Sequence, residues 1–124
     1  MFEKLEITRM AQAMASHAGA RMGVVSQNIA NADTPGYKAR DLPDFAQAYQ
    51  AQGAMKTTRA GHLGAAEQPV PAPRGQTAMA DPNGNTVSLE AEMVKAVEVR
   101  QQHDMALSIY RATSDMLRTS LGRR

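Results

Sequence analysis

The chain of 124 residues contains no cysteine and no tryptophan, and only 4% of its residues are aromatic. The absence of cysteine excludes disulfide bonds and thiolate metal sites, and it is compatible with either redox compartment. Large rings usually supply much of the area that a compact domain buries. The hydrophobic fraction is an ordinary 43%, but alanine and methionine contribute much of it. We therefore expect one domain with a thin core and with part of its apolar surface reserved for partners.

Long apolar runs and strong charge are also missing. No run approaches the roughly 20 apolar residues that a membrane-spanning helix needs, so we expect no direct membrane insertion. The first ten residues hold acids where a secretory signal has basic residues, and they lack an apolar stretch. Composition alone would therefore place the protein in the cytoplasm. The net charge is only +2 and the basic residues are scattered, which argues against nucleic acid as a partner.

Proline is absent from both ends of the chain. All six prolines fall between residues 35 and 82, and a proline in a helix interior costs about 3 kcal/mol. This partition predicts a mainly α fold in three parts. Residues 1–33 would form a helix, residues 34–87 a turn and an extended, flexible linker, and residues 88–124 a second helix. The two end segments together would make one helical core domain.

The N-terminal segment has the stripe of a coiled-coil helix from about Ile7 to Ala32. Its small and apolar residues are three or four positions apart: Ala11, Met14, Ala18, Met22, Val25, Ile29 and Ala32. Small residues repeat beside this stripe at four-residue spacing, at Ala15, Gly19 and Gly23. Each mid-helix glycine costs about 1 kcal/mol relative to alanine. The segment is therefore either a mediocre helix with tolerated glycines or a helix that packs closely against neighbours.

A second stripe runs from about Leu89 to Leu121 in unbroken steps of four and three. Its positions are Leu89, Met93, Ala96, Arg100, His103, Leu107, Tyr110, Ser114, Leu117 and Leu121. A second apolar row consists of Val94, Val97, Met105, Ile109, Ala112 and Met116. One apolar face suffices for a surface helix. Two faces indicate either a helix buried in one domain or, as we expect with so thin a core, a helix that contacts several partners.

The C-terminal helix also has a recognisable start. Ser88 is its expected N-cap, and Glu90 and Glu92 lie where the helix dipole favours anions. Residues 81–85 before it have turn composition, and residues 45–49 suit one short helical turn. Residues 50–76 are largely Ala, Gly, Gln, Pro and Thr, which bury too little apolar area to offset their ordering entropy. We expect the middle to be irregular and mobile, with at most a short hairpin.

Residues 28–41 join the first helix to the middle, and they read Asn28-Ile-Ala-Asn-Ala-Asp-Thr-Pro-Gly-Tyr-Lys-Ala-Arg-Asp41. A proline pushes the residue before it out of the helical region, so Thr34 should not continue the helix. Pro35 and Gly36 suit the two central positions of a type II turn, the second of which has a positive φ. Local physics predicts no more here than a helix stop and a turn.

The whole string, however, resembles the N-terminal signature of the bacterial flagellar rod and hook axial protein family. The matching residues are Ser26, Asn28, Ile29, Ala30, Asn31, Thr34, Pro35, Gly36 and Tyr37. Within that family, the uninterrupted run from Asp33 to Asp41 is similar to the proximal-rod members. Residues 83–93 resemble the start of their C-terminal helix, and residues 57–62 resemble a mid-chain element less distinctively. The Pro/Ala-rich residues 65–80 depart from the pattern.

The resemblance implies that the two end helices pair as an antiparallel coiled coil and that copies stack helically into a hollow rod. The implied function is structural: a proximal-rod subunit that transmits torque from the membrane ring to the distal rod and hook. The implied partners are other copies, other rod subunits, the rod–membrane-ring junction protein, the MS ring and the flagellar type III export apparatus. The implied location is the periplasm-spanning basal body, reached by export without a cleaved signal peptide, which replaces the cytoplasmic expectation.

The two stripes and the second apolar row supply the residues that we expect at the assembly interface. They are Ala11, Met14, Ala18, Met22, Val25, Leu89, Met93, Val97, Leu107, Ile109, Tyr110, Leu117 and Leu121.

An enzyme is not expected, and neither is a cofactor. His17, His62 and His103 lack the spacing of metal ligands. The sequence contains no phosphate-binding loop, nucleophile elbow or paired acid motif. We therefore expect no catalytic, cofactor-binding or metal site. The alternative function is a soluble two-helix adaptor that binds one partner and has no catalytic activity.

Overall fold

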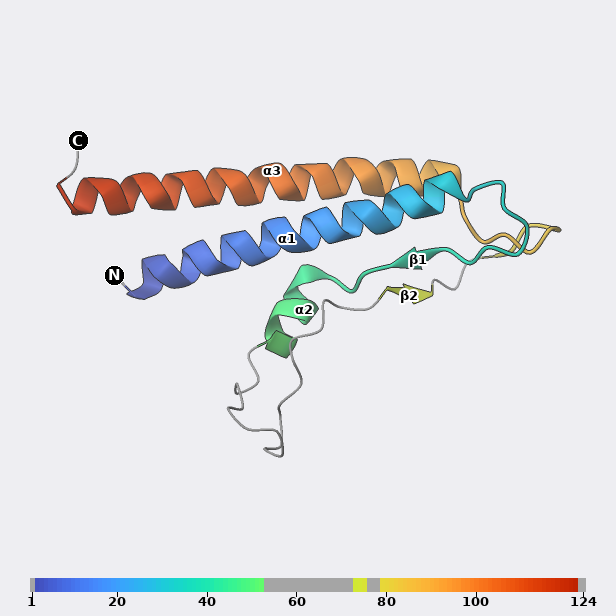
Figure 1. The fold of residues 1–124 in the computed structure, drawn as a ribbon, viewed down its shortest axis with the longest axis horizontal. Coiled ribbons are helices and arrows are strands. Elements are labelled where there is room, and N and C mark those ends of the chain that lie inside the picture. The colour runs from blue at the N-terminus through green and yellow to red at the C-terminus, as the bar shows by residue number, and fades with distance from the viewer. Residues whose placement is uncertain (1, 53–72, 76–78, 123–124) are drawn as a thin grey trace, which may run out of the picture.

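Two long helices dominate the structure, a computed structural model that describes residues 2–52, 73–75 and 79–122. Helix α1 spans Phe2–Ala30 and helix α3 spans Leu89–Ser120. They lie side by side and antiparallel, so that both chain ends are at the same end of the molecule (Figure 1). The prediction of a mainly α fold with paired end helices is confirmed.

Helix α1 begins before the predicted Ile7, since Glu3 in its first turn favours a helix start and no proline interrupts it. It ends at Ala30, slightly earlier than predicted. The N–H of Asn31 still donates to the carbonyl of Gln27 at 3.1 Å, and the chain then turns.

Helix α3 begins at the predicted residue. Ser88 is its N-cap, and its side chain accepts the N–H of Ala91 at 3.5 Å. The last turn holds Arg118, which complements the negative end of the helix dipole. Gly122 follows with a φ of 68° and donates its N–H to the carbonyl of Thr119. A glycine in this left-handed conformation is a common helix terminator.

The middle segment runs back along α1 (Figure 1). Strand β1, Arg40–Asp41, pairs antiparallel with strand β2, Arg74–Gly75, and Arg40 lies opposite Gly75. This pair confirms the expected short hairpin. Helix α2, Phe45–Gln52, is longer than the single turn predicted there. The expected mobility of residues 50–76 concerns a stretch that lies mostly outside the described residues.

Buried residues recur every seven positions on both long helices. Those of α1 are Ala11, Ala18 and Val25, and those of α3 are Glu92, Val99, Ala106 and Thr113. Helix α3 packs along α1. The two rows therefore form the seam of an antiparallel coiled coil.

The seam on α3 lies one residue before the predicted stripe, which placed Met93 and Arg100 where the structure buries Glu92 and Val99. One residue turns a helix by about 100°. The alanines on α1 let the helices approach closely, so that small and β-branched side chains of α3 fill the seam. Bulkier side chains such as Met93 lie beside the seam. The sequence pattern favoured them because they are large and apolar.

The core is thin, as predicted. Its buried hydrophobic side chains are small: Ala11, Ala18, Val24, Val25, Ala39, Leu42, Val87, Val99 and Ala106. Larger apolar side chains remain exposed, namely Phe2, Leu5, Ile7, Met10, Met79, Leu89, Met93, Val94, Val97, Met105, Tyr110, Met116 and Leu121. Within the described residues, no helix combines the length and apolar character that crossing a membrane requires.

Candidate functional site

The candidate site is the end of the molecule where residues 28–41, which we call the elbow, meet residues 81–86, which we call the Asn-Gly turn (Figure 1). In the elbow, the N–H of Tyr37 donates to the carbonyl of Thr34 at 3.3 Å, and Gly36 has a φ of 73°. This is the predicted type II turn, with Pro35 at its second position.

The Asn-Gly turn is a tight hairpin. The N–H of Gly84 donates to the carbonyl of Asp81 at 2.8 Å, and the N–H of Asp81 donates to the carbonyl of Asn85 at 2.8 Å. Gly84 has a φ of 83°, whereas no described non-glycine residue has a positive φ. Pro82 and Asn83 are therefore the centre of a type I turn, and the left-handed glycine closes it as a bulge.

The two turns are bonded to each other through their backbones. The N–H of Gly36 donates to the carbonyl of Asn83 at 3.0 Å, and the N–H of Thr86 donates to the carbonyl of Tyr37 at 3.0 Å. A Cβ added to Gly84 would lie 3.5 Å from the Cα of Gly36. Two glycines thus meet face to face. We call the whole contact of the elbow with the Asn-Gly turn and with the adjoining residues of α1 and α3 the joint.

Asn85 closes the end of α1. Its side-chain amide, only 1% exposed, donates to the carbonyls of Asn31, Ala32 and Thr34 at 2.8 to 2.9 Å. These three carbonyls belong to the turn that follows α1, and Asn85 supplies their donor from a segment more than 50 residues later in the chain. Its Oδ1 accepts the N–H of Val87 at 2.7 Å, so both ends of this amide are bonded.

Asn28 also uses both ends of its side-chain amide for hydrogen bonds, and it is fully buried. Its Nδ2 donates to the Arg40 carbonyl at 2.6 Å and to a Glu92 carboxylate oxygen at 3.1 Å. Its Oδ1 accepts the N–H of Arg40 at 3.1 Å and the hydroxyl of Tyr37 at 3.2 Å. One side chain therefore connects α1, the elbow strand and α3.

A charged cluster extends this contact. Lys95 donates to Glu92 at 2.9 Å and lies 3.8 Å from Asp41, whose carboxylate accepts two hydrogen bonds from Arg21 at 2.9 and 3.0 Å. Burial alone would raise the pKa of Asp41. The bonds and charge of Arg21, the Leu42 N–H and the charge of Lys95 outweigh burial, so the pKa is lowered from its usual value of 3.8.

The predicted signature residues divide between the interior and the surface of the elbow. Asn28 is buried, and Ile29, Asn31 and Tyr37 are half-buried. The exposed ones are Ala30, Thr34, Pro35 and Gly36. The interior members hold the joint together, while the exposed ones shape the turn.

The predicted assembly residues also fall into groups. Ala11, Ala18 and Val25 are buried in the seam. The half-buried ones are Met14, Met22, Leu107, Ile109 and Leu117, and the exposed ones are Leu89, Met93, Val97, Tyr110 and Leu121. Their part in assembly stays a prediction.

Sequence reasoning missed Asn85, Arg21 and Asp41 as members of the joint, and it assigned Glu92 only to the helix dipole. An acid at a core position of a seven-residue repeat was the available signal for Glu92, because a buried carboxylate needs partners. The resemblance of residues 83–93 marked the right stretch. It did not reveal that this stretch bonds to the elbow.

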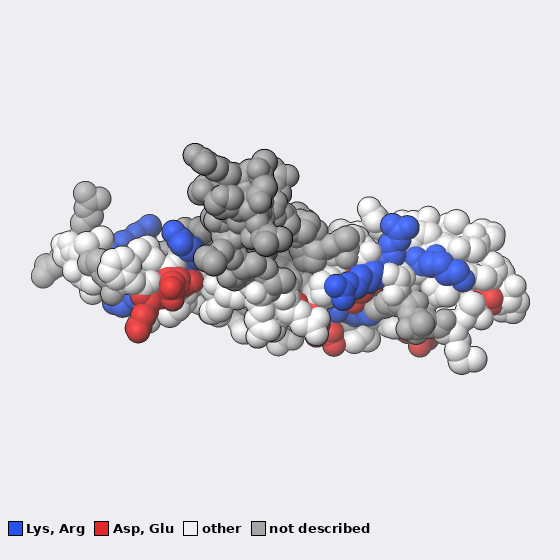
Figure 2. Space-filling view, turned by 90° about the horizontal axis from the view of Figure 1, so that it is seen from below, with Lys and Arg blue, Asp and Glu red and all other residues white. Residues whose placement is uncertain are grey.

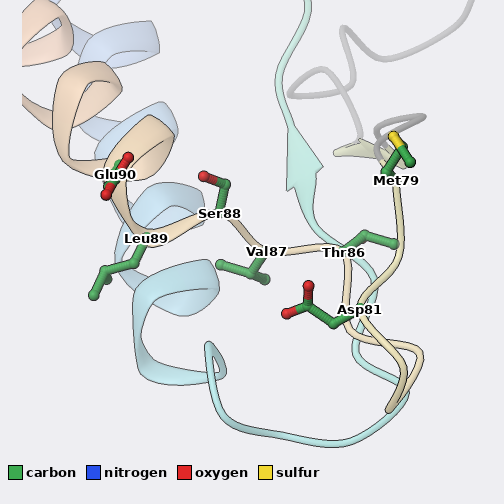
Figure 3. Close-up of a pocket in the computed structure, with 7 residues that line it drawn as sticks. All are labelled: Met79, Asp81, Thr86, Val87, Ser88, Leu89 and Glu90. Carbon is green, nitrogen blue, oxygen red and sulfur yellow. The ribbon is translucent and has the colours of Figure 1, made fainter.

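The described residues offer little for catalysis. His17 donates from Nε2 to the Pro43 carbonyl at 2.8 Å and packs edge-on against Phe45. No group of three or more His, Cys, Asp or Glu in the described part could hold a metal. An open hollow beside the start of α3 is lined by the residues labelled in Figure 3. Its two carboxylates, Asp81 and Glu90, come from the Asn-Gly turn and the first turn of α3.

Comparisons with known proteins bear directly on the elbow. Residues 11–38 match the family described as "Flagella basal body rod protein". The flagellar basal body rod protein FlgB of Agrobacterium fabrum is 30% identical over 127 aligned residues, which cover 93% of this chain and 92% of that protein. FlgB of Escherichia coli K12 is 32% identical, covering 87% and 88%. FlgB of Cereibacter sphaeroides is 38% identical, covering 70% and 73%. With similarity of this extent over nearly the whole length, the chain belongs to the FlgB family of flagellar basal body rod proteins.

Proposed function

We propose that the protein is a structural subunit of the proximal rod, that its copies stack helically, and that the stack transmits torque from the membrane ring to the distal rod and hook. Family membership makes it a component of the flagellar basal body. The observation that supports stacking is where the apolar side chains lie. The small ones fill the seam, and many of the large ones are exposed on the outside of the helix pair.

One exposed apolar cluster lies at the start of α3. Leu89, Met93, Val94 and Val97 are between 44% and 69% exposed, and three of them follow each other at four-residue spacing. Leaving so many large apolar side chains of one helix in water is unfavourable unless a partner covers them, and such patches mark interaction sites.

A different cluster lies at the opposite end of the helix pair. Phe2 and Leu5 at the start of α1 are 85% and 50% exposed, and Met116 and Leu121 at the end of α3 are 56% and 65% exposed. Lys4 and Met116 line one hollow, so these two helix ends are neighbours. Two unlike patches at opposite ends of one molecule favour contacts that are not self-complementary. Such contacts build open helical assemblies rather than closed dimers.

The charge distribution on the described surface also fits stacking. On the face seen in Figure 2, most of the described surface is uncharged, and Lys and Arg gather in two separate groups. The partners that we propose are further copies, other rod subunits, the rod–membrane-ring junction protein and the MS ring. We also propose delivery by the flagellar type III apparatus without a cleaved signal, and no catalytic activity.

Replacing Met93 and Val97 together by serine tests the stacking surface. Both side chains are exposed, so the free energy of unfolding should change by only about 0.5 kcal/mol or less, while rod assembly and swimming should be lost in a complemented deletion strain. The matched control replaces Glu98 and Gln101, exposed polar residues of the same helix, by serine. Normal swimming of the Met93/Val97 variant would contradict the proposal, as would equal loss of swimming in the control.

Replacing Pro35 and Gly36 by alanine tests the elbow separately. Both changes remove the features that stop α1, so the helix should lengthen in circular dichroism, and the rod should fail to assemble. A motile strain that carries this variant would show that the turn does not set the geometry of stacking.

A further inference from the structure

The joint contains one peptide bond with unusual reactivity. Asn83-Gly84 is the only Asn-Gly pair in the sequence. An asparagine side-chain amide can be attacked by the backbone nitrogen of the next residue. Glycine favours this attack because it has no side chain to hinder the approach of its nitrogen. Asn83 is exposed, so water can reach it.

We propose that Asn83 is a site of spontaneous deamidation which is open to reaction in the unfolded chain and is closed when the joint forms. The Gly84 nitrogen attacks Cγ of Asn83 and forms a five-membered imide. The side-chain nitrogen leaves as ammonia with the proton that the Gly84 nitrogen loses. One water then opens the ring, at the side-chain carbonyl to give aspartate or at the backbone carbonyl to give isoaspartate. No electrons are transferred, and no reactant other than water is needed.

The folded geometry holds each participant away from this reaction. The attacking nitrogen of Gly84 has its hydrogen bonded to the Asp81 carbonyl at 2.8 Å, which disfavours its deprotonation. The Oδ1 of Asn83 accepts the N–H of Asn85 at 3.0 Å, which fixes the side chain. Ring closure also requires a change in ψ of Asn83, the rotation about its Cα–C bond. That rotation would move the Asn83 carbonyl away from the Gly36 N–H that it accepts at 3.0 Å.

The two products affect the joint differently. Aspartate keeps an acceptor oxygen for the N–H of Asn85 and leaves the backbone unchanged, so the joint should still close. Isoaspartate adds a methylene to the main chain next to Gly84, where even an added Cβ would come into van der Waals contact with Gly36. A chain that stays unfolded for long would therefore lose its ability to close the joint, whereas a folded chain would keep it.

The test measures the deamidation rate of the full chain at constant pH across a series from trimethylamine oxide through buffer to urea. Osmolyte and urea shift the folding equilibrium in opposite directions, and circular dichroism reports the folded fraction in each sample. Mass spectrometry of the peptide that contains Asn83 gives the rate, and an isoaspartate-specific methylation assay separates the products. We expect the rate to follow the unfolded fraction and to differ by about tenfold or more between the extremes, because reaction must await opening of several hydrogen bonds.

Two variants sharpen the test. Asn85→Ala keeps the Asn-Gly pair but removes bonds that hold the joint, so its rate in osmolyte should exceed that of the natural chain. Asn83→Gln removes the reactive residue and should abolish the signal at this peptide. A rate that stays constant through the folding transition of the natural chain would overturn the proposal, whether or not Asn85→Ala folds. This outcome leaves the stacking proposal untouched, because stacking depends on the exposed apolar side chains of the two helices and not on the chemistry of Asn83.

Discussion

Replacement of Asn28 by alanine is the sharpest test of the joint, because this fully buried side chain makes four hydrogen bonds to three other residues. The substitution leaves the Glu92 carboxylate with one partner fewer in a buried site. It also leaves the Arg40 backbone without the pair of bonds that hold β1 against α1. The side chain is small, so the cavity formed is a minor part of the cost.

The magnitude follows from the bonds. A neutral buried hydrogen bond contributes about 1 kcal/mol and one to a charged group about 1.5–3 kcal/mol. The four bonds therefore amount to roughly 4–6 kcal/mol. Alanine recovers up to about 0.7 kcal/mol of helix propensity at this position. A net loss of roughly 3–5 kcal/mol is a large share of the 5–15 kcal/mol that stabilises a typical domain.

Asn31→Ala is the matched control, since Asn31 belongs to the same signature but is only half-buried. Its side chain bonds locally to the Gln27 carbonyl and the Thr34 hydroxyl, so the loss should be about 1 kcal/mol or less. Urea unfolding followed by circular dichroism gives both values, with equal slopes if unfolding stays two-state. Equal losses for the two variants, or a loss below about 1 kcal/mol for Asn28→Ala, would refute the bond-by-bond reasoning.

Two further predictions concern charge and backbone. Because the folded-state pKa of Asp41 lies below its usual 3.8, its ionised form contributes stability that is present above that value and is lost as the pH falls through the lower, folded-state value. The urea midpoint should therefore fall more steeply with acid below about pH 4 in the natural chain than in Asp41→Asn. Gly84→Ala should cost about 1–2 kcal/mol, because its φ of 83° is a left-handed conformation that a residue with a Cβ adopts only at a cost. Gly19→Ala, in open space within α1, should instead stabilise by about 0.5–1 kcal/mol, and thermal unfolding of both variants would reveal a reversed order if the argument is wrong.

Local patterns were sufficient to predict the helices and the turn of the elbow. Proline placement separated the end helices from the middle, Ser88 marked the start of α3, and Pro35-Gly36 predicted the type II turn. Each of these features depends on interactions between residues a few positions apart. Such interactions can be predicted from the sequence, because the missing N–H and the fixed φ of a proline affect only residues within about one turn.

The joint could not be predicted in the same way, because its bonds join residues far apart in the chain. Asn85 donates to carbonyls more than 50 positions earlier, and nothing in its own neighbourhood indicates which helix end it will close. The one-residue difference in the α3 seam has a related origin. Periodicity gives the spacing of a stripe, but the choice between Met93 and Glu92 depended on buried partners for the acid, supplied by Asn28 and Lys95.

The polar joint also explains how the two helices adopt one register, although the seam between them is uniform along its length. The seam repeats every seven residues with similar small side chains, so sliding one helix by a heptad, about 10 Å, would still bring small residues together. The same slide would separate Asn28 from Glu92 and Asn85 from the end of α1, leaving buried polar groups without partners at substantial cost. Buried polar contacts are known to select register in this way, at some expense in stability. The register in turn fixes the distance between the apolar clusters at the two ends of the molecule. In the stacking that we propose, the elbow therefore determines where the next subunit can bind, although its buried residues need not touch that subunit.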